Sequence, residues 1–226
     1  MTITTSTLTK AAAIAAMAGG LLFIAVQIKH PVLNAPFTTS TEYAVRETAK
    51  IVMAVCSLIG ITGIYLRQAQ KIGVLGLIGY AVLAVGYLTI LSVQVIGVFV
   101  LPDLANSQPG YVDDVLAVAT SGTPVGDVSR MRTLSHVGAA YIVGGVVFGI
   151  ALFRAGVLAR WAAVLMSVGA VATVATFQLP ELTQRLFAIP AGVALIGLGY
   201  SLWRDQRTMG TVPGPVATQL DPAGAK

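Results

Sequence analysis

The side chains in this sequence that could do chemistry are carboxylates, histidines and isolated amide or basic groups near the ends of apolar segments. A carboxylic acid can donate a proton, a neutral imidazole can accept one, and both can hydrogen-bond a polar group on an otherwise apolar molecule. The catalytic candidates are Glu47, Asp103, His136 and Glu181, and the ligand-binding candidates are His30, Gln94, His136 and Arg185. Ionisable groups this close to hydrocarbon usually face water or the protein interior, so their gathering at one end of the helices indicates a functional site. The alternative is that they anchor helix ends at a membrane surface.

His136 is the candidate with the most direct electrostatic argument. It would lie in the first turn of the helix predicted over 134–153, where the helix dipole disfavours the imidazolium and leaves a neutral base. Glu47 also falls in a predicted first turn, where a carboxylate is favoured, and it could pair with Lys50 one turn further on. These two positions predict a base and an ion pair near one end of the protein.

The remaining candidates have less specific roles. Asp103 or Glu181 would act as a proton donor if a dry cavity kept the group protonated. Gln94 would either hydrogen-bond across the helices or line a cavity. His30 and His136 could join one carboxylate at a metal ion, but no HxxxH or HExxH spacing supports this, so no metal site is predicted. Motifs for nucleotides, haem and magnesium diphosphate are missing as well, so no cofactor is predicted.

The elements that must position these groups are apolar helices long enough to cross a membrane. The sequence is 56% hydrophobic and 10% charged, and it has no charged side chain from Ile72 to Leu101. A membrane crossing needs about 20 apolar residues, so this segment spans with length to spare. We therefore predict an all-α, polytopic membrane protein with six transmembrane helices in a bundle. The spans are expected at about 11–28, 48–66, 72–101, 134–153, 161–179 and 185–203.

The polar segments divide the rest of the chain. Residues 1–10 would form a short cytoplasmic leader, and Arg67 to Lys71 would form a tight basic hairpin between the second and third spans. An outer loop is expected over 102–133, with a short helix from Tyr111 to Ala119. The Pro- and Gly-containing tail at 204–226 is predicted to be disordered.

The second, fourth and sixth predicted spans end in similar short sequences. Each of these contains a glycine and a leucine followed by an arginine, which is Arg67, Arg154 or Arg204. This recurrence favours three related helical hairpins; the alternative is that unrelated apolar helices each end in arginine. The basic residues in the short loops favour an orientation in the cell membrane that places both termini in the cytoplasm. Gly145 and Gly149 have the spacing of a close helix crossing.

The second half of the chain resembles small integral membrane proteins of high-GC Gram-positive bacteria. Two sequences between Gly144 and Arg204 carry the resemblance, GGVVFGIALFRAGVLARWAAVLMSVGAV and PELTQRLFAIPAGVALIGLGYSLWR. The word GITGIYLRQAQKIGVLGLIGY in the first half is similar to the same set, so the resemblance covers nearly all of residues 10–205. It implies a six-helix integral membrane fold. These proteins are uncharacterised and have no known activity, so the resemblance transfers no functional residue.

The leading functional hypothesis is a helical bundle that binds an apolar or lipid-like small molecule in an outward-facing, partly polar cavity. Binding alone and catalysis on the bound molecule are both compatible with the sequence. The alternatives are a transporter or channel component, an enzyme resembling membrane-embedded terpene cyclases that uses acidic residues, and an accessory subunit acting by helix packing. Expected partners are membrane lipids, the small molecule, and a second copy of the chain or another membrane protein. Nucleic acid is excluded as a partner because the basic residues occur singly, without a basic patch.

Overall fold

The computed structural model describes residues 4–28, 31–120, 122–175 and 188–209; most of these residues are helical, and none of them forms a strand. The expected all-helical fold is confirmed. The helices are α1 (Thr5–Ala25), α2 (Ala35–Thr38), α3 (Thr41–Phe99), α4 (Leu101–Leu104), α5 (Pro109–Ala119), α6 (Ser129–Gly138), α7 (Ala140–Ala155), α8 (Arg160–Ala175) and α10 (Ala188–Met209).

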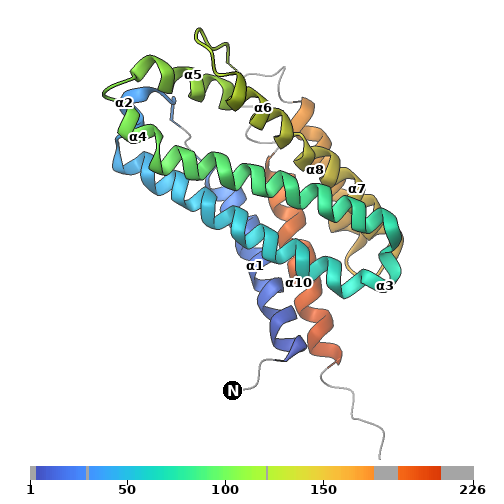
Figure 1. Ribbon diagram of the computed structural model, residues 1–226. Helices are drawn as coiled ribbons and strands as arrows, with labels where there is room; N and C mark the ends of the chain where they lie inside the picture. Colours follow the sequence, from blue (N-terminus) through green and yellow to red (C-terminus); the bar gives the residue numbers. More distant parts are fainter. Residues whose placement is uncertain (1–3, 29–30, 121, 176–187, 210–226) are drawn as a thin grey trace, which may run out of the picture.

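Helix α3 is folded back on itself at Gly73, which gives it two limbs, 41–72 and 74–99 (Figure 1). The hydroxyls of Thr62 and Tyr80 lie 3.0 Å apart across the limbs. Since Gly97 near the end of the second limb faces the start of the first, the limbs are antiparallel. The expected hairpin at Arg67 to Lys71 is wrong, because these residues are helical and the chain reverses at Gly73.

We expect Gly73→Ala to destabilise the protein by about 1–3 kcal/mol. Gly73 has φ 65° and ψ −170°, a backbone conformation that residues other than glycine rarely adopt. An added Cβ would meet no atom within 4 Å, so the expected cost is backbone strain and not a clash. Thermal unfolding in mild detergent measures the effect. Gly110→Ala is the matched control, because it too has open space but lacks a positive φ; equal stability of the two variants would contradict the prediction.

Small residues bring neighbouring helices into backbone contact. A Cβ added at Gly86 of the second limb would lie 2.4 Å from the Cα of Tyr141 on α7. A Cβ added at Gly149 of α7 would lie 2.7 Å from the carbonyl oxygen of Ala163 on α8, and one at Gly145 would lie 2.9 Å from the Cβ of Ala170. The close crossing predicted from the Gly145 and Gly149 spacing is therefore confirmed.

The long helices pack in the order of the sequence, and the last one returns to the first. Helix α1 lies along limb 41–72, limb 74–99 lies along α7, α7 along α8, and α8 along α10. Contact between α10 and α1 closes the ring: a Cβ added at Gly20 would lie 2.4 Å from the carbonyl oxygen of Gly192. The start of α1 and the end of α10 lie near each other (Figure 1).

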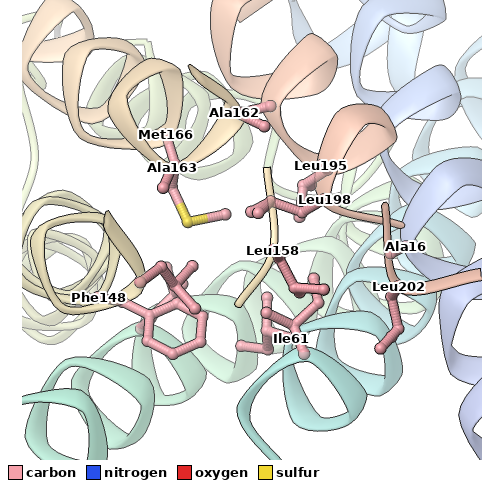
Figure 2. Close-up of a cluster of buried hydrophobic side chains, with 14 of the residues drawn as sticks. Ala16, Ile61, Phe148, Leu158, Ala162, Ala163, Met166, Leu195, Leu198 and Leu202 are labelled. Atoms are coloured by element: carbon pink, nitrogen blue, oxygen red, sulfur yellow. The ribbon is translucent and has the colours of Figure 1, made fainter. Parts of the chain in front are cut away.

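The main hydrophobic core lies where α1, α3, α7, α8 and α10 meet. Ile61, Phe148 and Leu198 are fully buried there. Leu158, from the connector between α7 and α8, lies among the side chains of the surrounding helices (Figure 2). This core joins the helices into one packed unit.

The outward faces of the helices are apolar too. On α8, Trp161, Val164, Val168 and Val171 are between 46% and 58% exposed and recur every three or four residues, so they form one outward stripe. Among the residues that the structure describes, three helical segments are long and apolar enough to cross a membrane, namely Thr5–Ala25, Thr41–Phe99 and Ser129–Ala155. Exposed apolar faces of this extent indicate a membrane protein.

Several helix boundaries differ from the expected ones. Helix α1 begins at Thr5, before the apolar run, because the Thr4 hydroxyl oxygen accepts a hydrogen bond from the Thr7 N–H at 3.2 Å. Helix α10 continues to Met209, into the segment predicted to be a tail. The short helix expected near Tyr111 is confirmed by α5.

Candidate functional site

A cavity of about 690 Å³ lies at the end of α3 where its two limbs start and finish. Helices α5 and α6 and the loop between them complete its wall. The polar lining residues are Tyr43, Glu47, Lys50, Thr89, Gln94, Thr120, Thr123, Arg132, Ser135 and His136. The apolar lining includes Leu33, Ile90, Val93, Val115, Leu116 and Met131.

Helices α2, α4 and α5 lie at this end of α3 (Figure 1). A second, smaller hydrophobic core holds them together. It contains Ala35, Leu101, Ala105, Val112, Val115, Leu116 and Val128. Two carboxylates tie it together. Asp113 Oδ1 accepts a hydrogen bond from the Ala35 N–H at 2.7 Å, and Asp114 accepts from the Val125 and Gly126 N–H groups at 2.6 and 2.9 Å. These bonds fix α5 and the following loop over the cavity.

Glu47 and Lys50 form an ion pair in the cavity wall. Their side chains are 6% and 16% exposed, so each charge depends on the other for compensation. Tyr43 lies one turn before Glu47 and is also buried. A Cβ added at Gly97 on the second limb would lie 3.1 Å from the Tyr43 hydroxyl and 3.7 Å from Glu47 Oε2. A larger residue at position 97 would therefore crowd both groups. The predicted Glu47–Lys50 pair is confirmed.

Helix α6 contributes Arg132, Ser135 and His136 to the opposite wall. It begins at Ser129, whose N–H donates a hydrogen bond to the Asp127 carboxylate at 3.0 Å. This bond, the Ser129 hydroxyl and nearby Arg132 lower the pKa of Asp127. The carboxylate thus stays charged near the positive end of the helix dipole, where it stabilises the first turn.

The expected position of His136 in a first turn is wrong. Because α6 starts at Ser129 and ends at Gly138, His136 lies in its last turn. The first-turn argument for a neutral imidazole therefore does not apply. His136 is exposed and lines the cavity.

The structure brings together three of the sequence-predicted residues, because Glu47, Gln94 and His136 all line the cavity. Asp103 is not among the lining residues; it lies on α4 and is exposed. The predicted candidates His30, Glu181 and Arg185 lie outside the described residues.

Other lining residues were not predicted: Tyr43, Thr89, Arg132 and Ser135. Tyr43 could have been found from sequence, because it precedes Glu47 by four residues and shares its helix face. Thr89 and Ser135 carry no such signal, since their place depends on how α6 packs against α3.

Within the part of the chain that the structure describes, no group of three His, Cys, Asp or Glu residues is placed to hold a metal ion. Comparisons of the sequence and structure with family models, curated proteins and solved structures found no match. The chemistry of the site therefore rests on its own residues.

Proposed function

We propose that the chain crosses a bacterial inner membrane six times as a helical bundle, with both termini in the cytoplasm. The spans are α1, the two limbs of α3, α6 with α7, α8 and α10. Antiparallel packing of successive helices supports this arrangement, since it leaves the start of α1 and the end of α10 at one end. Arg67, Lys71, Arg154 and Arg204 lie at or near helix ends on that side, as the positive-inside pattern requires.

We propose further that the cavity bounded by α3, α5 and α6 binds an apolar or lipid-like small molecule. The observation that carries this proposal is a cavity of about 690 Å³ whose apolar wall, with Val115, Leu116 and Met131, faces a few convergent polar groups. The apolar body of the ligand would pack against α5 and Met131. Its polar group would reach Gln94, Ser135 or His136.

The other hypotheses have less support in the same geometry. Glu47 is paired with Lys50, and Asp103 is exposed away from the cavity, so neither is an isolated acid held for protonating an isoprenoid. Gly145 and Gly149, which could serve an accessory subunit as a packing face, already contact α8 within the chain. Among the described residues, no contact favours a transporter or channel over a binding protein.

Ala119→Trp is expected to abolish binding. Ala119 lines the cavity from α5 and is exposed, so an indole there fills the ligand space without disturbing a packed core. Native mass spectrometry of protein purified in mild detergent measures a co-purifying apolar adduct. His136→Ala should lower occupancy by about fivefold, the effect of one lost hydrogen bond.

Tyr111→Trp is the matched control, because it introduces the same indole on α5 outside the cavity lining. It should retain the adduct at wild-type occupancy. A wild-type protein without any adduct, or a wild-type protein whose adducts all persist in Ala119→Trp, would contradict the proposal. A bound second polypeptide in place of the adduct would favour the accessory role.

A further inference from the structure

A second cavity, of about 920 Å³, lies at the opposite end of limb 41–72. It separates the first turns of α1 from the last turns of that limb, and Val157 and Gln206 complete its edge. None of its lining residues is shared with the candidate functional site.

The cavity exists because α1 and limb 41–72 separate at this end. They are in close contact further along, where Gly60 faces Ala16 and Gly63 faces Ala12. Beyond Ala12 the cavity lies between them. Its apolar side includes Leu8 and Leu66, which are 60% and 66% exposed. This side is open to the same surroundings as the apolar outer faces of the helices.

The other side of the cavity is polar and positively charged. Lys71 is exposed there, and no ion pair of the described residues involves it. Arg67 lines the cavity as well and pairs with Asp205, with Nε–Oδ2 and Nη2–Oδ1 distances of 2.5 and 3.3 Å. Because the Arg67–Asp205 pair has no net charge, Lys71 gives this side of the cavity its net positive charge.

Gln68 is the decisive residue because it is 1% exposed and is one of the residues that line this cavity. Its Nε2 donates to the Ile64 carbonyl oxygen at 3.4 Å, while its buried Oε1 has no hydrogen-bond partner among the described residues. A buried acceptor without a donor is costly, so a ligand that brings a donor to this position gains affinity.

We propose that this cavity binds an anionic phospholipid with a hydroxylated headgroup, of which phosphatidylglycerol is the simplest. The phosphate lies near the Lys71 ammonium and the first turn of α1, where the N–H groups of Thr5 and Ser6 have no partner within the helix. A headgroup hydroxyl donates to Gln68 Oε1. An acyl chain lies along Leu8 and Leu66.

A free phosphate ion fits the cavity less well. It would use the charged side and leave the exposed leucines and the large remaining volume unfilled. A lipid satisfies both sides together, and a bilayer supplies it directly beside the exposed apolar faces. Under the proposed topology, this lipid belongs to the cytoplasmic leaflet.

The test uses the delipidated full-length chain in a neutral detergent, titrated by native mass spectrometry with phosphatidylglycerol, phosphatidic acid and phosphatidylcholine. The wild type should bind phosphatidylglycerol most tightly and phosphatidylcholine least. Lys71→Gln should weaken binding of both anionic lipids by about fivefold, because one charge near the phosphate is lost. Gln68→Leu should remove the preference for phosphatidylglycerol over phosphatidic acid and leave phosphatidic acid binding unchanged.

Arg154→Gln is the matched control, since it removes one exposed charge at the same end of the protein but outside the cavity. It should bind like the wild type. Equal binding by Lys71→Gln, a retained headgroup preference in Gln68→Leu, or displacement of the lipid by inorganic phosphate would overturn the proposal. Ala119→Trp should keep full phospholipid binding, so failure at one cavity is distinguishable from failure at the other.

Discussion

Lys50→Met is expected to lower the free energy of unfolding by about 2–3 kcal/mol. The substitution keeps most of the apolar length of the side chain but leaves the Glu47 carboxylate, 6% exposed, without its cation. Breaking a fully buried pair costs roughly 3–5 kcal/mol, and the smaller value here reflects the partial exposure of Lys50. Denaturant titration in mild detergent, followed by tryptophan fluorescence, measures the change.

Glu42→Gln tests whether burial causes this effect. Glu42 pairs with Arg46 on the same helix at 2.9 Å, but its side chain is 56% exposed. Its loss should cost less than about 1 kcal/mol. The double variant Glu47→Gln with Lys50→Met removes both charges and should recover most of the lost stability. Similar losses in Lys50→Met and Glu42→Gln would show that the Glu47–Lys50 pair is not structurally important.

Gly144→Ala is expected to destabilise the protein by about 2–3 kcal/mol, although alanine favours a helix by about 1 kcal/mol over glycine. The added Cβ would lie 2.2 Å from the backbone nitrogen of Leu83 and 2.5 Å from its Cα. Backbone atoms cannot move aside as a flexible side chain can, so α7 and the second limb of α3 would have to separate. The separation would also loosen the core around Phe148.

Gly138→Ala is the matched control, because its Cβ would meet a single atom, Thr89 Cγ2, at 3.9 Å. That is an ordinary contact, so the variant should be as stable as the wild type or slightly more stable. Thermal unfolding of both variants under the same detergent conditions separates the two outcomes. If Gly144→Ala unfolds at the wild-type temperature, the close contact between these helices does not limit stability.

Much of the helical content could be predicted because it depends on local patterns. Helix α5 starts with Pro109 and carries Val112, Val115 and Leu116 on one face, which is the spacing of an amphipathic helix. The reversal at Gly73 could not be predicted in the same way. Glycines at 73, 76 and 79 all fit the sequence pattern, and only the folded chain shows which of them adopts a positive φ.

The site could be predicted where its contacts are local. The Glu47–Lys50 pair lies within one helical turn, and its residue types suffice to predict it. The position of His136 in the last turn of α6 does not follow from the apolar pattern, because the long apolar run begins at Leu134 whereas α6 begins at Ser129. The contribution of Gln94 and Ser135 to one cavity depends on the packing of α6 against α3, which neither local sequence encodes.

The contact between α10 and α1 also determines when, during synthesis, the ring of helices can close. Helix α1 leaves the ribosome first and gains limb 41–72 of α3 as a neighbour early, but the partner of its Gly20 face, α10, is made only after α7 and α8. In a lipid bilayer the uncovered face of α1 is already solvated by acyl chains, so it can wait for α10 without the aggregation that an aqueous setting would cause. The arrival of α10 is therefore the step that closes the ring, and a chain that stops after α8 would leave the ring open.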